Sequence, residues 1–239
     1  MEYDFAIIYF GLTRSVKKTH ESHIKHVFDV LKREKLSYKI FMHTWKTKDG
    51  TQNVWQDIIP EKIDYTEHLL LSPDFYKIDD ENEFLDGVNM DDYFYKDVWD
   101  KHGYKPEGEW LPKLVSNYIC MLESQKRAFD MVKATGDKYK LVMFIRPDIT
   151  IHNDLPLYTI IPHHDRIQIP NHSHFEGIQD QVAILNYEHA CIYSCRINDL
   201  AEFRKNNGKI VAEKYCKYII TKYNMVVNDL DFQYVITRP

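Results

Sequence analysis

Five consecutive apolar residues, 141–145, lead directly into Arg146, Pro147 and Asp148. A short, unbroken apolar run is typical of a strand that is covered on both faces, as in the middle of an α/β sheet. Pro147 has no amide hydrogen to donate and disfavours helical backbone at Arg146, so we expect strand pairing to stop there. The pattern therefore predicts a cation and a carboxylate at the carboxyl end of a central strand, where open α/β sheets bind their ligands.

The N-terminal segment predicts that this central strand has parallel neighbours. Residues 5–10 form a second apolar run, residues 16–34 carry apolar side chains at helical spacing, and residues 37–42 have the pattern of another strand. A strand, a helix and a strand in this order form a βαβ unit, which joins parallel strands. Further helices are expected at 116–133, 187–203 and 211–223, a short strand at 166–170 and a closing strand at 226–236. We therefore expect one α/β domain over residues 1–239, with a mostly parallel central sheet flanked by helices.

Gly11 ends the apolar run at 5–10 and opens a tight loop, residues 11–15, that contains Thr13 and Arg14. Glycine lets the backbone come close to a ligand, the following helix points its first amides outward, and the planar fork of an arginine suits phosphate. An ordinary strand-to-helix turn with a surface arginine is the alternative. Because a second cation, Arg146, is expected at another strand end, both interpretations stay open.

A polar segment, residues 171–179, leads to Asp180 directly before the apolar run at 182–185. An aspartate where a loop meets the end of a strand or helix is well placed to act as a general base or to orient a hydroxyl. Its alternative role is capping or hydrogen bonding within the loop.

Composition and charge argue against several classes of function. The formal net charge of -5 argues against a general nucleic-acid partner, because little neutralises a phosphate backbone over a large surface. No apolar run approaches the length of a membrane span, and Met1 is followed by acidic residues in place of a basic and then apolar signal. The 4 cysteines lack the paired spacing of a metal site and suit the core of a protein in a reducing compartment. We expect a soluble, intracellular protein of the cytoplasm.

Residues 46–110 are the least regular part of the chain and are rich in acidic and aromatic residues. The acidic pairs 79–80 and 91–92 invite a metal-binding interpretation, but neither follows an apolar strand run. A solvated loop face is therefore expected for both. We expect this insertion to cover one end of the sheet, where Trp99, Tyr104 and Trp110 could line an acceptor groove.

Taken together, these segments resemble glycosyltransferases of the GT-A type, in particular small polysaccharide-building transferases of viruses and microbes. The resemblance spans most of the chain and is carried by residues 7–14, 41–45, 144–149, 177–181 and 213–238. It implies a GT-A-like, Rossmann-type single domain in which a nucleotide-sugar, such as a UDP-sugar, lies across the carboxyl ends of the strands. Family members hold a divalent metal on the diphosphate with an Asp-x-Asp motif.

In this sequence the motif position reads Arg146-Pro147-Asp148, so only Asp148 matches the final carboxylate. Two arrangements follow from the resemblance. Asp148 could hold Mn²⁺ or Mg²⁺ together with waters and diphosphate oxygens. Alternatively, Arg146 and Arg14 could neutralise the leaving diphosphate directly.

The predicted activity is transfer of a hexosyl or pentosyl group from a nucleotide-sugar donor to a hydroxyl of a glycan acceptor. Gly11, Thr13, Arg14 and the motif residues would contact the donor. The resemblance makes Asp180 the base of an inverting enzyme, while a retaining mechanism stays open. Two alternatives remain: a nucleotidyltransferase, and a non-catalytic protein for glycan binding or assembly on a degenerate fold.

Overall fold

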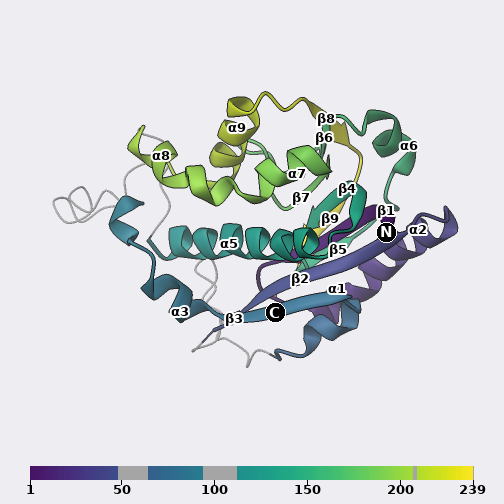
Figure 1. Cartoon of the computed structure of the whole chain (residues 1–239), viewed down its shortest axis with the longest axis horizontal. Helices are drawn as coiled ribbons and strands as arrows, with labels where there is room; N and C mark the ends of the chain where they lie inside the picture. The colour runs from purple at the N-terminus through teal and green to yellow at the C-terminus, as the bar shows by residue number, and fades with distance from the viewer. Residues whose placement is uncertain (48–63, 94–111, 207–208, 239) are drawn as a thin grey trace.

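The centre of the molecule is a seven-stranded sheet with the strand order β3-β2-β1-β4-β7-β6-β8 (Figure 1). The computed structural model describes residues 1–47, 64–93, 112–206 and 209–238. In sheet order the strands are β3 (Phe75–Asp80), β2 (Tyr38–Lys46), β1 (Glu2–Phe10), β4 (Lys138–Ile145), β7 (Val182–Asn186), β6 (Ile167–Pro170) and β8 (Val227–Leu230). Strand β7 is antiparallel to both of its neighbours, and the other neighbouring strands are parallel. The expected α/β fold with a mostly parallel central sheet is confirmed.

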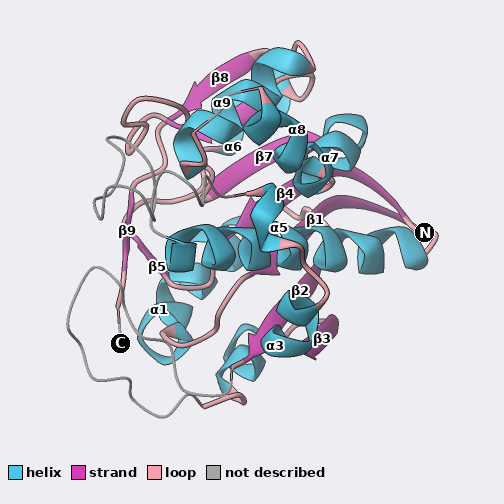
Figure 2. Ribbon diagram, turned by 90° about the vertical axis from the view of Figure 1, so that its left-hand side faces the viewer, coloured by secondary structure: helices cyan, strands magenta, loops and turns pink. Residues whose placement is uncertain are grey.

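Helices cover both faces of this sheet (Figure 2). One face packs against α5 (Pro112–Ala134), α7 (Tyr187–Ser194) and α9 (Ala212–Lys222). The other face packs against α1 (Val16–His23), a π-helical turn (Ile24–Phe28), α2 (Asp29–Arg33) and α6 (Leu157–Ile160). The short helix α8 (Leu200–Lys205) joins a third apolar cluster, formed with α5 and α9.

Strand β4 explains why its sequence is an unbroken apolar run. Leu141, Met143 and Ile145 face the core under α1 and α2, whereas Val142 and Phe144 face the core under α5 and α7. Because successive side chains of a strand point to opposite faces, both alternating sets must be apolar when both faces are buried.

The expected closing strand at 226–236 is two strands in two different sheets. Strand β8 ends at Leu230, and a second small sheet pairs β5 (Ile149–Ile151) with β9 (Tyr234–Ile236), antiparallel. Burial alternates from residue 229 to residue 236, but the partner strand β6 ends at Pro170, opposite Leu230. The Asn153 side chain holds the connection between β8 and β9. It accepts from a backbone amide of that connection at 2.6 Å and donates to a backbone carbonyl of the same connection at 2.9 Å. The chain therefore turns toward β5, close to Asp148.

Two other expectations need correction. The helix expected at 187–203 is interrupted after α7 by a short 3₁₀ turn, Arg196–Asp199, before α8 begins. Within the irregular segment 46–110, the structure describes strand β3, the short helix α3 (Glu81–Asp86) and 3₁₀ turns at Glu67–Leu71 and Met90–Asp92. A further 3₁₀ turn, Ile161–His163, follows α6. The aromatic residues expected to line an acceptor groove, Trp99, Tyr104 and Trp110, lie outside the described residues. No helix in the described ranges combines the length and apolar character needed to cross a bilayer.

Replacing Phe144 by alanine tests the doubly covered strand. Its ring is fully buried and lies 6.1 Å from the Phe129 ring and 5.4 Å from the Tyr193 ring, centroid to centroid. We expect Phe144→Ala to lower the free energy of unfolding by about 3–5 kcal/mol in urea titrations, because it leaves a cavity in the core. Val235→Ala, at an exposed position of β9, is the control and should change it by less than about 0.5 kcal/mol. Similar losses in both variants would contradict this account of the core.

Candidate functional site

The end of β4 carries a buried ion pair with two further arginines around it. The Nε of Arg146 donates to Oδ1 of Asp148 at 2.8 Å, and its Nη2 donates to Oδ2 at 2.6 Å. The Asp148 side chain is only 3% exposed, and Nη1 of Arg238 lies 3.8 Å from its Oδ2. Burial opposes ionisation of Asp148, but the charges of Arg146, Arg14 and Arg238 outweigh it and lower the pKa of that carboxyl. These three guanidinium groups therefore share one carboxylate.

Three donors, two from helix α1 and one from the C-terminal tail, hold the backbone of this motif. The consecutive carbonyl oxygens of residues 147–149 accept, in order, from the Thr19 hydroxyl at 2.7 Å, the Thr237 amide at 2.8 Å and Nε2 of His23 at 2.9 Å. Burial lowers the pKa of His23 to about 4, so its ring is neutral near pH 7. The hydrogen on Nε2 serves the motif while Nδ1 accepts from the Tyr9 hydroxyl at 3.0 Å. Helix α1 and the C-terminal tail thus fix the motif on opposite sides.

The loop at 11–15 lies at the end of the adjacent strand β1 and brings Arg14 to this cluster. Gly11 has φ +90°, a backbone conformation that strains other residues, and an added Cβ would meet nothing within 4 Å. Thr13 and Ser15 are buried, yet their hydroxyls, like Nε of Arg14, have no hydrogen-bond partner among the described residues. Buried polar atoms in folded proteins normally have partners. Three consecutive side chains of this loop thus have buried polar atoms without a partner in the described part of the chain.

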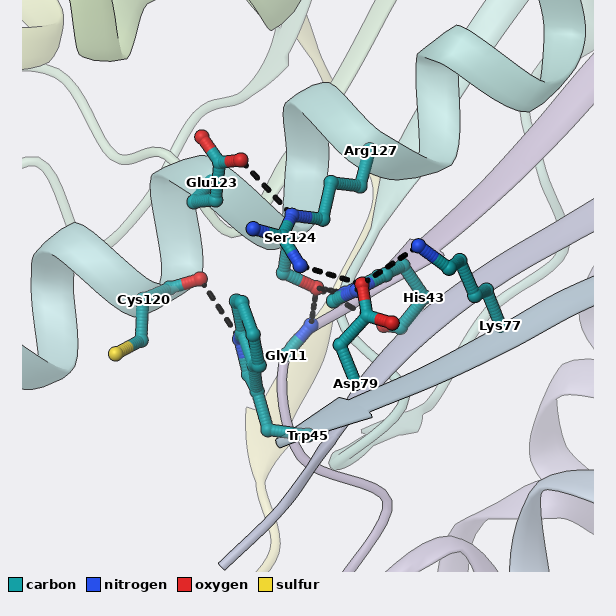
Figure 3. A network of polar contacts seen from close by, with 9 residues as sticks. All are labelled: Gly11, His43, Trp45, Lys77, Asp79, Cys120, Glu123, Ser124 and Arg127. Carbon is teal, nitrogen blue, oxygen red and sulfur yellow. Dashed lines mark hydrogen bonds and ion pairs between the residues drawn. The ribbon is translucent and has the colours of Figure 1, made fainter. Parts of the chain in front are cut away.

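A line of hydrogen bonds ties Gly11 to helix α5 and to the end of β3 (Figure 3). The Gly11 amide donates to Oγ of Ser124 at 2.8 Å, Ser124 lies 2.9 Å from Nδ1 of His43, and Nε2 of His43 lies 3.1 Å from Oδ2 of Asp79. Burial lowers the pKa of His43 to about 4. A neutral ring facing a carboxylate carries its hydrogen on Nε2. Nδ1 then faces the Ser124 hydroxyl, which donates to the His43 carbonyl at 2.9 Å. Arg127 completes the line by pairing with Asp79.

This network corrects the expectation for Asp79, which is an ion-paired residue at the end of β3, next to Lys77 and Arg127, and not part of a solvated loop. Its order of serine, histidine and aspartate resembles a hydrolase triad. The hydroxyl of the fully buried Ser124, however, accepts from the Gly11 amide and donates to the His43 carbonyl, so it is engaged within the protein. The network is a support for the loop at 11–15.

Asp180 lies beside the motif but faces a second arginine. It precedes strand β7, where the Arg146 amide donates to the Gln181 carbonyl at 3.1 Å. Its Oδ2 lies 3.6 Å from Nη2 of the fully buried Arg196, whose guanidinium also stacks 3.9 Å from the Tyr193 ring centroid. Burial raises the pKa of Asp180, while the charges of Arg196 and Arg146 oppose this rise. The fold thus brings the segment that ends at Asp180 next to the motif at 146–148.

The side chains around Asp148 decide whether it fits the predicted role of a metal ligand. Both oxygens of its carboxylate already accept from Arg146, and arginines supply the neighbouring charges. Within the described part of the chain, no group of three or more His, Cys, Asp or Glu side chains could hold a metal ion. The side chains around Asp148 therefore do not fit a Mn²⁺ or Mg²⁺ site, since divalent cations of this kind need free carboxylate oxygens.

Two arginines of the site were not predicted from the sequence. Arg238 is 90 positions beyond Asp148 and reaches it only because β9 pairs with β5. Arg196 stands at the interruption of an expected helix, and nothing in the local pattern distinguishes it from a surface residue. Only the pairing of distant segments could have revealed either one.

No protein-family model matches this sequence, and no curated protein matches it. Among solved structures, the apo form of mouse xyloside xylosyltransferase 1 is 9% identical, covering 96% of this chain and 85% of its own, with a TM-score of 0.44. A glycosyltransferase involved in the glycosylation of the major capsid of PBCV-1 is 10% identical over 95% and 82%, with a TM-score of 0.43. A putative glucose-1-phosphate thymidylyltransferase from Bacillus anthracis, in complex with a sucrose, is 10% identical over 99% and 89%, with a TM-score of 0.41. Likenesses this remote do not assign an activity.

The two neutral histidines predict an acid-sensitive fold. Burial lowers the pKa of His23 and of His43 from 6.5 to about 4. The unfolded chain therefore binds more protons between these values, and the free energy of unfolding falls as the pH drops from about 6.5 to about 4. We expect a loss of about 2 kcal/mol per histidine between pH 7 and pH 5, measured by urea titration.

Single variants separate the two contributions. His43→Gln should remove one histidine's share of the difference between pH 7 and pH 5, whereas His164→Gln, at an exposed position, should leave the whole difference in place. Equal stability of the wild-type chain at both pH values would contradict the burial of neutral rings.

Proposed function

We propose that this protein is a glycosyltransferase that moves a sugar from a nucleotide-sugar donor to a hydroxyl of a glycan acceptor. The observation that carries the proposal is the arginine cluster at the carboxyl ends of the adjacent parallel strands β1 and β4. A nucleoside diphosphate is the leaving group of such a reaction, and its developing negative charge is what fixed guanidinium groups stabilise. The resemblance of residues 7–14 and 144–149 to GT-A transferases supports the same substrate class.

The proposed reaction breaks the bond between the anomeric carbon of the donor and an oxygen of its diphosphate. The electron pair of that bond leaves with the diphosphate, which Arg14 and Arg146 stabilise. The acceptor oxygen forms the new bond to the anomeric carbon, and its proton passes to a carboxylate. In the inverting form of the reaction, Asp180 receives this proton.

Asp180 suits the role of a base because burial raises its pKa above that of an ordinary aspartate, so its carboxylate binds a proton more strongly. Its Oδ2 accepts no hydrogen bond within the described part of the chain. The competing role is structural: Asp180 neutralises Arg196, which is fully buried. In a non-catalytic glycan-binding protein on this fold, the ion pair with Arg196 would be the whole role of Asp180.

Donor binding is the first test. We expect thermal unfolding of the protein to shift upward with at least one sugar nucleotide from a panel of UDP-, GDP- and CMP-sugars, because a ligand that binds only the native state stabilises it. Each donor is measured both in EDTA and with Mn²⁺. If none shifts the transition under either condition, the proposed substrate class is wrong.

Replacing Asp180 distinguishes the base from the counter-ion. We expect Asp180→Glu to keep the charge beside Arg196, and hence the fold and donor affinity, but to lower kcat at least about 100-fold because the carboxylate is displaced. Asp180→Asn should lower kcat similarly and also destabilise the fold, by about 3–5 kcal/mol, because Arg196 loses its partner. A folded Asp180→Glu variant that transfers sugar at the wild-type rate would remove Asp180 as the base.

A further inference from the structure

The site around Asp148 has more positive charge than its carboxylate can balance. Arg146 occupies both carboxylate oxygens, whereas Arg238 is 3.8 Å from Oδ2 and Arg14 acts on the carboxylate through its charge. One carboxylate cannot neutralise three guanidinium groups, so positive charge is left over at this strand end. Asp180 is the next carboxylate whose charge acts on Arg146, and a buried arginine already lies beside it.

The arginines repel one another in the absence of an anion. Burial lowers the pKa of Arg14 and of Arg238, and the positive charge of Arg146 lowers both further. The buried Nε of Arg14 has no hydrogen-bond partner among the described residues. An anion between these groups would relieve the repulsion and supply the missing acceptor, and planar guanidinium forks match phosphate oxygens.

The C-terminal tail holds Arg238 in this position. The Thr237 amide donates to the Asp148 carbonyl at 2.8 Å, and the Thr237 hydroxyl lies 2.6 Å from that of Thr150. Lys18 Nζ donates to the Arg238 carbonyl at 3.3 Å. These contacts join the backbone of the tail to β5 and to helix α1, and so keep Arg238 beside Asp148. Fixed donors lose less entropy when an anion binds.

We propose that Arg14, Arg146 and Arg238 form a binding site for the donor's diphosphate that works without a divalent metal, with Asp148 as the internal counter-ion that orients Arg146. This inference rests on the proposed function for the identity of the anion. The chemistry of the site itself requires only a compact dianion or polyanion such as a diphosphate.

A metal ion in the place expected for Asp-x-Asp enzymes meets two obstacles here. It would compete with Arg146 for the oxygens of Asp148, and it would face the charges of three guanidinium groups. Both steps cost electrostatic free energy, whereas a diphosphate bound directly by the arginines requires neither.

Isothermal titration of the full chain with inorganic pyrophosphate tests the site. We expect binding in EDTA, no tightening when Mn²⁺ replaces EDTA, and weakening with added salt. Arg238→Gln, which removes the charge and keeps a polar side chain, should raise the Kd at least about tenfold. Arg238→Lys should recover part of that loss, because the charge returns without the planar fork.

Arg33→Gln is the matched control. Arg33 ends α2 and pairs with Asp154 at the surface. It lies shortly before the amino end of β2, whereas the arginine cluster follows the carboxyl ends of β1 and β4. Its Kd for pyrophosphate should equal that of the wild type, and thermal unfolding checks that every variant is folded. Pyrophosphate binding that requires Mn²⁺, or an Arg238→Gln variant with wild-type affinity, would overturn the proposal.

The same titrations separate this inference from the proposed function. Pyrophosphate binding in EDTA that depends on Arg238, without binding of any sugar nucleotide, would support the anion site and reject the glycosyltransferase proposal. Sugar-nucleotide binding that appears only with Mn²⁺ would support the glycosyltransferase proposal and reject the metal-free anion site.

Discussion

The bidentate ion pair between Arg146 and Asp148 is the interaction on which the rest of the site depends. Burying a carboxylate is costly unless it is paired and hydrogen-bonded, and here Arg146 satisfies both oxygens. The pair keeps Asp148 ionised inside the protein and holds the Arg146 guanidinium at the strand end. Removing Arg146 would take both hydrogen bonds and the nearest positive charge from the buried Asp148 carboxylate, so the motif is structural before it is functional.

The backbone around that pair is fixed by groups that are polar and neutral. Two buried histidines, His23 and His43, each have Nδ1 beside a hydroxyl and donate from Nε2. One holds the motif after β4, and the other holds the glycine after β1 through Ser124. Both strand ends that supply arginines are therefore rigid without adding charge. A rigid, positively charged strand end is what an anion-binding site requires, because its donors need no rearrangement.

The second aspartate of the site, Asp180, is paired differently from Asp148. Asp180 is as deeply buried as Asp148, but its partner Arg196 approaches one oxygen only, at 3.6 Å. A looser pair leaves the carboxylate able to accept a proton, and burial raises its pKa accordingly. Two aspartates a few residues from the same strand ends thus have opposite pKa shifts, because one is fully hydrogen-bonded by its arginine and the other is not. This contrast is why one suits a counter-ion and the other a base.

The sequence by itself determined the sheet's central strands, because a strand buried on both faces must be apolar throughout, as residues 141–145 are. It also determined where β4 must stop, since proline at 147 has no amide hydrogen, and it placed Gly11, Arg14, Arg146 and Asp148 at strand ends. The tertiary structure decided their partners. Arg238 enters the site because β9 pairs with β5, and Asp79 is tied to Gly11 through a serine and a histidine from two other elements. Ion pairs and hydrogen bonds between distant segments depend on distances across the fold, and such distances leave no periodic pattern in the chain.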